Sequence, residues 1–277
     1  MRRIVHLSDL HFGTELPDVV EGLLRDIERQ PAHLLAVSGD LTQRARRGQF
    51  VAARAFLDRI ALPKLIVPGN HDIPLYNLAA RFGWPLEGYR RHVTEDLSPR
   101  FHDGEIAVAG VNTARPDRWK DGSISDEQIE SLSGYFSSQP ASAFKVLVAH
   151  HPFIPPVNDA TATLVDGAKA ALRTLEAAGC HLILAGHLHL AYAGDARPHH
   201  VEIKRSILVA QAGTAVSHRR RDEPNAYNVV VVDGSRLQIE VRAWDGVQFT
   251  ATGVKEFEQL EHGWTELPAR RRSADHG

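Results

Sequence analysis

Five short apolar segments of this chain each end in polar side chains of the kinds that bind metal ions. The apolar segments, which we predict to be β-strands, are residues 2–7, 33–38, 64–67, 145–149 and 182–185. The polar residues that follow them are Asp9, His11, Asp40, Asn70, His71, Asp72, His150, His151, His187 and His189. Because ligands of open α/β sheets bind outside the carboxyl ends of the strands, the pattern predicts one site gathered from the whole chain.

Amphipathic segments alternate with the first strands. Residues 17–29 and 48–60 each place apolar side chains on one face of a helix. The polar turns at Asp9, Asp40 and Asn70 recur about every 30 residues, which is the length of one βαβ unit. The regular spacing predicts parallel strands joined by helices.

The rest of the chain changes in character along its length. A strand is predicted over residues 105–111 and helices over 125–137 and 166–178. Later strands follow without long helices between them and predict an antiparallel second sheet. These later strands are residues 206–211, 228–232 and 238–243.

Together these segments predict an α/β fold, a four-layer α/β/β/α sandwich of two mixed sheets flanked by helices. We expect a single domain over residues 1–265. Residues 73–100 are rich in aromatic residues and contain two prolines, which predicts a helical insertion. Residues 266–277 are polar, and we expect them to form a frayed tail.

Composition excludes several functions. With a net charge of −2 the protein has no overall positive potential, so stable nucleic-acid binding is not expected. No apolar run reaches the ~18 residues of a membrane span, and Ser8 and Asp9 interrupt the apolar start too early for a secretory signal. The single cysteine, Cys180, fits a reducing compartment. We therefore expect a cytoplasmic protein with no membrane span, and leave a homodimer open.

The polar residues at the strand ends offer oxygen and nitrogen donors, which suit Mn, Fe, Zn or Co ions. Asp9 and His11 are two residues apart, as are His187 and His189, so that one turn can aim both side chains at one ion. The carboxylate of Asp40 has two oxygens and can bridge two ions. Any one of these short segments is more commonly a polar turn. Five of them in order, each after an apolar strand, favour a metal site.

The segments DLH, GD, GNHD, HHP and GHLH resemble those of the calcineurin-like metallophosphoesterases over about residues 4–190. The resemblance implies two divalent metal ions. It assigns one ion to Asp9, His11, Asp40 and His189, and the other to Asp40, Asn70, His150 and His187. It also implies that His71 is the catalytic histidine and that Asp72 orients it.

The same resemblance implies an activity. A hydroxide bridging the two ions would attack phosphorus, and His71 would protonate the leaving oxygen. Residues 111–132 are similar to the bacterial class III cyclic-nucleotide phosphodiesterases, which implies small phosphodiester substrates and, among them, cyclic nucleotides. The alternative is a nucleotide-sugar or lipid pyrophosphate hydrolase, for which residues 73–100 would wall an apolar cleft. A non-catalytic metal-binding scaffold is disfavoured, because every ligand position and His71 are present.

Four further residues are expected to border the substrate. Asn112 and Arg115 follow the strand 105–111, His151 is the neighbour of His150, and His218 precedes three arginines. An arginine in the loop after His218 can bind a second phosphate or a diester oxygen. The alternative for both loops is a polar turn whose arginines are solvated.

Overall fold

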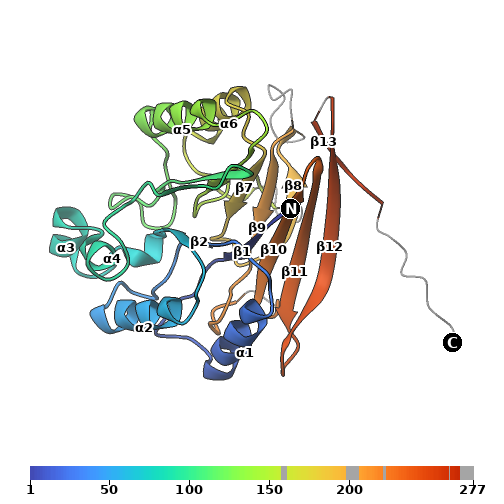
Figure 1. Ribbon diagram of the computed structural model, residues 1–277. Helices are drawn as coiled ribbons and strands as arrows, with labels where there is room; N and C mark the ends of the chain where they lie inside the picture. The colour runs from blue at the N-terminus through green and yellow to red at the C-terminus, as the bar shows by residue number, and fades with distance from the viewer. Residues whose placement is uncertain (157–160, 198–205, 221–222, 262, 269–277) are drawn as a thin grey trace, which may run out of the picture.

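The computed structural model describes the chain except for residues 157–160, 198–205, 221–222, 262 and 269–277. Its strands form two mixed sheets that lie face to face, with helices on their outer sides (Figure 1). The structure confirms the predicted four-layer sandwich.

The first sheet has seven strands. Its strands β1, β2 and β3 are parallel, and the other four extend the sheet antiparallel from β1. In order across the sheet the strands are β13 (Gly263–Glu266), β12 (Phe249–Leu260), β11 (Arg236–Trp244), β10 (Ala226–Asp233), β1 (Arg2–Leu7), β2 (Leu34–Ser38) and β3 (Lys64–Val67).

The second sheet has six strands. Four of them are parallel, and an antiparallel strand closes each edge. In order the strands are β4 (Arg100–His102), β5 (Ile106–Gly110), β6 (Phe144–Val148), β7 (Leu182–Ala185), β9 (Leu208–Gln211) and β8 (Tyr192–Asp195).

Each strand contributes to two apolar layers, because successive side chains point to opposite faces of a sheet. In β1, Ile4 packs between the two sheets, whereas Val5 packs in the cluster that includes the outer helices α1 and α2. In β6, Val146 lies between the sheets and Leu147 packs in the cluster of α5 and α6. The bounds of these helices are α1 Pro17–Glu28, α2 Arg47–Asp58, α5 Asp126–Ser138 and α6 Ala168–Ala177.

Residues 73–100 contain two short helices, α3 (Leu78–Gly83) and α4 (Glu87–His92). The hydroxyl of Tyr89 on α4 donates to the carbonyl of Ile66 on β3 at 2.9 Å. The guanidinium of Arg81 on α3 is buried and donates to three backbone carbonyls, those of Pro74, Pro116 and Arg118. These bonds anchor the two helices to β3 and to the loop after β5.

The strands after residue 206 do not form a sheet of their own, so that expectation was wrong. Strand β9 joins β7 in the second sheet, whereas β10 and β11 extend the first sheet from β1. The apolar pattern shows where these strands lie but not which sheet edge accepts them. The strands β4, β8, β12 and β13 were not predicted.

The end of the chain also differs from the expectation. Glu266, which was placed in the tail, ends β13, and the N–H of Leu267 donates to the carbonyl of Glu256 at 2.7 Å. The rest of the predicted tail, from residue 269 onward, lies outside the described residues.

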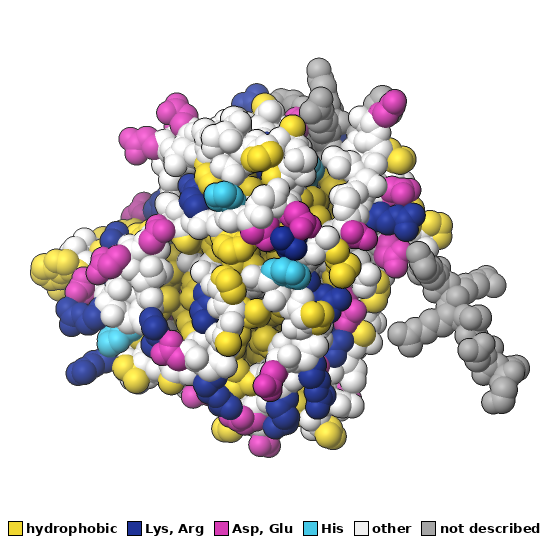
Figure 2. All heavy atoms as spheres, in the orientation of Figure 1, with side chains coloured by type: hydrophobic (Ala, Val, Ile, Leu, Met, Phe, Trp, Pro, Cys, Tyr) yellow, Lys and Arg dark blue, Asp and Glu magenta, His cyan; other side chains and the backbone are white. Residues whose placement is uncertain are grey.

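Two surface properties bear on function. In the part of the chain that the structure describes, no helix is both long and apolar enough to cross a bilayer. On the face shown in Figure 2, basic and acidic side chains are interspersed.

The parallel strands end level with one another. Leu7 pairs with Val37, Ser38 pairs with Val67, and Val148 pairs with Leu184. The loops that follow these strands are therefore brought together at one edge of the sandwich, where the polar residues of the sequence pattern lie.

Candidate metal centre

Seven predicted metal ligands lie at this edge, on the loops after five parallel strands. All are buried except His187, which is partly exposed. By strand they are Asp9 and His11 after β1, Asp40 after β2, Asn70 after β3, His150 after β6, and His187 and His189 after β7.

The first group of side chains surrounds Asp9. Its Oδ1 atom lies 3.6 Å from Nε2 of His11 and 3.7 Å from Nε2 of His189. Its Oδ2 atom accepts hydrogen bonds from the hydroxyl of Ser8 at 2.7 Å and from the backbone N–H of His187 at 3.0 Å. One carboxylate oxygen is thus held by the protein, and the other is left to face the two imidazoles.

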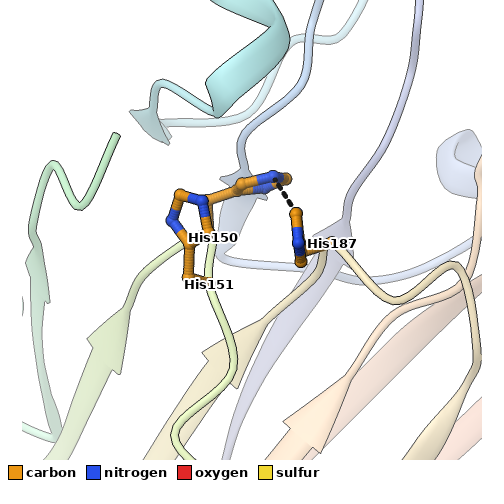
Figure 3. A group of neighbouring side chains, drawn as sticks. All are labelled: His150, His151 and His187. Carbon is orange, nitrogen blue, oxygen red and sulfur yellow. Dashed lines mark hydrogen bonds between the residues drawn. The ribbon is translucent and has the colours of Figure 1, made fainter. Parts of the chain in front are cut away.

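Asp40 links this group to a second one. Its Oδ1 accepts from the backbone N–H of His71 at 2.8 Å, while its Oδ2 lies 3.6 Å from Nε2 of His11 and 3.4 Å from Nε2 of His150. The Nε2 atom of His150 is also 3.1 Å from Oδ1 of Asn70 and 3.3 Å from Nδ1 of His187. Figure 3 shows His150, His151 and His187 gathered close together, with His150 hydrogen-bonded to His187.

These atoms fit divalent ions. Among the described residues, Oδ1 of Asp9 and Nε2 of His11 are buried without any hydrogen-bond partner. Buried polar atoms are normally satisfied, so an unpartnered pair facing one point indicates a ligand. Atoms bonded at ~2.1 Å to one ion would lie about 3.0–3.4 Å apart, close to the spacings found here. The carboxylate and imidazole donors suit Mn, Fe, Zn or Co.

The backbone at these ligands is unusual. Six non-glycine residues in the described chain have positive φ, and five of them are predicted ligands: Asp9 (52°), His11 (46°), Asp40 (53°), His187 (74°) and His189 (57°). This left-handed region is disfavoured for residues with a Cβ atom, and such strain gathers at functional sites. The turns hold the side chains in place at an energetic cost.

The outer ring nitrogens of two ligands are held by the protein. Nδ1 of His189 is 2.7 Å from the hydroxyl of Thr214, and Nδ1 of His150 is 2.8 Å from the carbonyl of Ser38. Each bond leaves Nε2 to face the cluster, as second partners of metal-binding histidines commonly do.

The charges of the cluster reinforce one another. Burial alone would raise the pKa of Asp9 and of Asp40, but the surrounding histidines hold both well below their usual range. Burial opposes the charged form of His150 as well, yet the two carboxylates raise its pKa to about 9. Burial, and then the neighbouring His150, lower the pKa of His187 to about 3. The carboxylates are therefore ionised, as metal ligands must be.

His71 lies beside this cluster, with its ring 4.9 Å from that of His11 in an edge-on arrangement. Its Nδ1 atom is 2.8 Å from the backbone carbonyl of Gln43. Burial, with smaller contributions from His11 and Arg219, lowers its pKa to about 4.

Asp72 does not touch the ring of His71, which differs from the expectation that it orients the histidine. Its carboxylate accepts hydrogen bonds from the backbone N–H groups of Gly69, Leu41 and Thr42. Burial and the nearby Asp40 raise its pKa to about 6. Asp72 therefore ties the turn after β3 to the turn after β2, and Gln43 orients the ring.

Two arginines approach His71. A guanidinium nitrogen of Arg44 lies 3.1 Å from Nδ1 of His71, and one of Arg219 lies 3.3 Å from the same atom. Arg44 was not predicted as a site residue. Its signal is a basic residue four positions after Asp40, in the same turn. Together the two side chains place positive charge next to the predicted catalytic histidine.

The predicted substrate-binding residues lie in two loops. Asn112 accepts from the backbone of Ala114, and the guanidinium of Arg115 donates to the carbonyls of Asn112 and Ala114. The side chain of His218 is exposed, and it is the adjacent Arg219 that reaches His71. Arg115 is therefore bonded to its own loop, and Arg219 rather than His218 approaches the cluster.

His151 is buried next to His150, but both of its ring nitrogens have partners. Nδ1 is 2.7 Å from the hydroxyl of Thr113, and Nε2 is 3.0 Å from the carbonyl of Lys120. His151 thus holds the loop after β5 against the cluster, although it forms a tight group with His150 and His187.

Comparison with solved structures supports the fold. A purple acid phosphatase from yellow lupin seeds superposes with a TM-score of 0.66 at 13% identity, over 90% of this chain and 52% of that one. A dimetal phosphatase from Danio rerio superposes with a TM-score of 0.64 at 12% identity, over 90% of this chain and 98% of that one.

Curated relatives share more sequence. A probable cyclic nucleotide phosphodiesterase of Synechococcus sp. is 23% identical over 210 residues, covering 68% of this chain and 74% of the relative. The glycerophosphodiester phosphodiesterase GpdQ of Enterobacter lignolyticus is 27% identical over 175 residues, covering 55% of this chain and 57% of the relative.

Residues 2–191 match the family model of the calcineurin-like phosphoesterases, and this stretch contains every residue of the cluster and His71. This chain is a member of the calcineurin-like phosphoesterase family.

Proposed function

We propose that this protein is a metal-dependent phosphodiesterase that hydrolyses small phosphodiesters, with cyclic nucleotides as the first substrates to test. The observation that carries the proposal is the position of Asp40, whose Oδ2 lies 3.6 Å from Nε2 of His11 and 3.4 Å from Nε2 of His150. A carboxylate oxygen in that position fits a bridge between two ions. The phosphodiesterase names of the curated relatives favour diesters.

The ligand assignment follows from the two groups of side chains. One ion would be held by Asp9, His11, Asp40 and His189, and the other by Asp40, Asn70, His150 and His187. When bound, two such ions supply Lewis-acid stabilisation of the phosphoryl oxygens and activate water as the nucleophile.

The remaining chemistry falls to residues beside the ions. Arg44 and Arg219 place two guanidinium groups where a phosphoryl group carries negative charge, and arginine binds such oxygens strongly. Nδ1 of His71 lies on the carbonyl of Gln43, so Nε2 is the atom left to face the leaving oxygen, and it would give a proton there in the imidazolium form of the ring.

One observation favours a second candidate, a lipid or nucleotide-sugar pyrophosphate hydrolase. Five large apolar side chains near the insertion are 54–76% exposed, although such groups usually pack inside. They are Tyr76, Leu78, Phe82, Trp84 and Trp119. The guanidinium of Arg44 lies 6.0 Å from the ring of Tyr76, which connects this apolar surface to His71. An amphiphilic substrate would cover both.

The test is a panel of activities after reconstitution with Mn²⁺, Fe²⁺, Co²⁺ or Zn²⁺. The substrates are bis(p-nitrophenyl) phosphate, p-nitrophenyl phosphate, 3′,5′-cyclic AMP, 2′,3′-cyclic AMP and a UDP-diacyl sugar. Asp40→Ala removes the bridging carboxylate, and Asp58→Ala, an exposed carboxylate on α2, is the matched control.

Cleavage of diesters and cyclic nucleotides that Asp40→Ala abolishes and Asp58→Ala keeps would support the phosphodiesterase. Cleavage of the pyrophosphate alone would move the proposal to the second candidate. Two bound ions without turnover on any substrate would contradict both.

A further inference from the structure

A chain of buried polar side chains crosses the first sheet beneath the cluster, on the side that faces the second sheet. Nε2 of His6 on β1 is 2.9 Å from the hydroxyl of Ser38 on β2, and Nδ1 of His6 is 3.4 Å from Nδ2 of Asn228 on β10. All three side chains are at most 1% exposed. The proposed function uses none of these side chains, so their burial in this layer needs another explanation.

The direction of each hydrogen bond follows from one fixed acceptor. Nδ2 of Asn228 also donates to the backbone carbonyl of Gln211 at 3.0 Å, and a carbonyl oxygen can only accept. This fixes the amide of Asn228, so Nδ1 of His6 accepts and Nε2 of His6 carries the proton. His6 therefore donates to the hydroxyl of Ser38, whose own proton points to the carbonyl of Leu7 at 3.4 Å.

A neutral His6 ring is required by this arrangement. Burial lowers the pKa of His6 to about 3, and the opposing effect of Asp9 is smaller. The ring is thus uncharged at neutral pH and keeps one donor and one acceptor nitrogen.

Ser38 joins this chain to the cluster. Its backbone carbonyl accepts from Nδ1 of His150 at 2.8 Å and lies 3.2 Å from the hydroxyl of Ser8. The space around the contact is tight, because a Cβ atom on Gly39 would lie 2.7 Å from Nδ1 of His150. A small rotation of the Ser38 peptide would therefore turn the His150 ring, whose Nε2 faces Asp40.

We propose that His6 is a positioning residue for His150 and acts through Ser38. By holding the hydroxyl of Ser38, it fixes the carbonyl that sets the rotation of the imidazole. The inference rests on the proposed function only in requiring a divalent ion at His150. Loss of the second partner of a metal-binding histidine typically costs roughly 10–100-fold in metal affinity, and removal of His6 leaves that partner in place but unsupported, so the lower end of this range applies.

The test measures metal binding and does not depend on turnover. Co²⁺ is titrated into the metal-free protein, where two ions should bind in two steps. The binding step that is lost in His150→Ala belongs to the ion near His150. In His6→Leu we expect that step to weaken by roughly tenfold and the other step to stay unchanged. His6→Gln keeps an N–H group near Ser38 and should restore most of the affinity.

Two further variants separate positioning from general loss of stability. Ser38→Ala removes the intermediate hydroxyl and should weaken the same binding step. Combining Ser38→Ala with His6→Leu should cause no further loss, because the two substitutions act through one contact. His33→Leu is the matched control. His33 precedes β2, at the end away from Asp40, and its Nδ1 accepts from the backbone N–H of Arg3 at 3.2 Å. It should leave both steps unchanged.

Three results would overturn the proposal. They are unchanged binding in His6→Leu, equal weakening of both steps, and an equal effect in His33→Leu. A wild-type protein that binds two ions but cleaves no phosphoester would overturn the proposed function and leave this inference standing.

Discussion

At the scale of single residues, His71 offers one free ring nitrogen, because the other lies 2.8 Å from the carbonyl of Gln43. We predict that His71→Ala keeps the metal ions and loses turnover most severely for poor leaving groups, which need a proton. General acid catalysis of this kind contributes roughly 10²–10⁴-fold. Diesters with p-nitrophenol and with alkyl leaving groups should be compared, with metal content measured in parallel. Equal loss for both would contradict the acid role.

Arg44 should act on substrate binding. A hydrogen bond to a charged group contributes about 1.5–3 kcal/mol, so Arg44→Ala should lower kcat/KM by roughly 10–100-fold. The charge-preserving Arg44→Lys should recover part of this, but not all, because lysine lacks the paired donors of a guanidinium. Arg54→Ala, which removes an exposed arginine of α2, is the matched control. Unchanged kinetics in Arg44→Ala would show that the guanidinium does not reach the substrate.

The grouping of the predicted ligands at one edge could be foreseen because each lies within four residues of the end of an apolar strand, a local signal. The roles of Asp72 and Arg44 could not. Asp72, in the turn after β3, bonds to the turn after β2. Arg44, in the turn after β2, approaches His71 in the turn after β3. Both roles therefore depend on how these two turns meet. Sequence spacing alone carries no information about that distance.

At the scale of elements, one ion pair ties helix α1 to the sheet. Asp26 on α1 accepts from the guanidinium of Arg242 on β11 at 2.6 and 2.9 Å, and from the hydroxyl of Tyr227 on β10. Asp26 is 5% exposed, and its removal would leave the hydroxyl of Tyr227 without its acceptor and the partly buried Arg242 with Glu240 as its remaining carboxylate. We predict that Asp26→Ala lowers the free energy of unfolding by about 3 kcal/mol.

Urea unfolding of Asp26→Ala checks this prediction. The control is Asp58→Ala, which removes an exposed carboxylate of α2. The ion pair is remote from the cluster in sequence and contacts none of its residues, so metal stoichiometry should be unaffected. A loss below about 0.5 kcal/mol would mean that the pair behaves like an exposed one.

Helices and central strands were predictable from their apolar periodicity, and β12 was not. Much of β12 is exposed, and its stretch from Thr250 to Val254 lacks the alternation that marks a half-buried strand. Its pairing with β11 defines it, and that contact is invisible in a local pattern.

At the scale of the whole molecule, buried neutral histidines set the response to acid. Burial, with a smaller effect of Lys145, lowers the pKa of His181 to about 4, and its Nδ1 accepts from the backbone N–H of Lys145 at 2.9 Å. In the unfolded chain His181 binds a proton near pH 6.5, whereas in the folded chain it does not. The folded state therefore loses stability as the pH falls from 6.5 toward 4. The shift corresponds to about 3 kcal/mol.

Free energies of unfolding at several pH values check this prediction. Between pH 6.5 and 4 the wild-type protein should lose more stability than His181→Gln, whereas the exposed His102→Gln should follow the wild type. If the free energy of unfolding fell equally with pH in the wild type and in His181→Gln, His181 would not be the cause of the acid sensitivity.

The left-handed backbone of five ligands has a consequence for anyone who alters this protein. Each such residue costs on the order of 1–2 kcal/mol, a cost that glycine does not carry. In the absence of metal, glycine should therefore raise stability at His11, whose buried Nε2 has no hydrogen-bond partner, whereas Asp9 and Asp40 also accept backbone N–H groups. Laboratory evolution that rewards heat resistance alone would favour the loss of this predicted ligand and leave a sturdier protein with a weakened metal site. Directed stabilisation of this enzyme must screen for metal retention in every round.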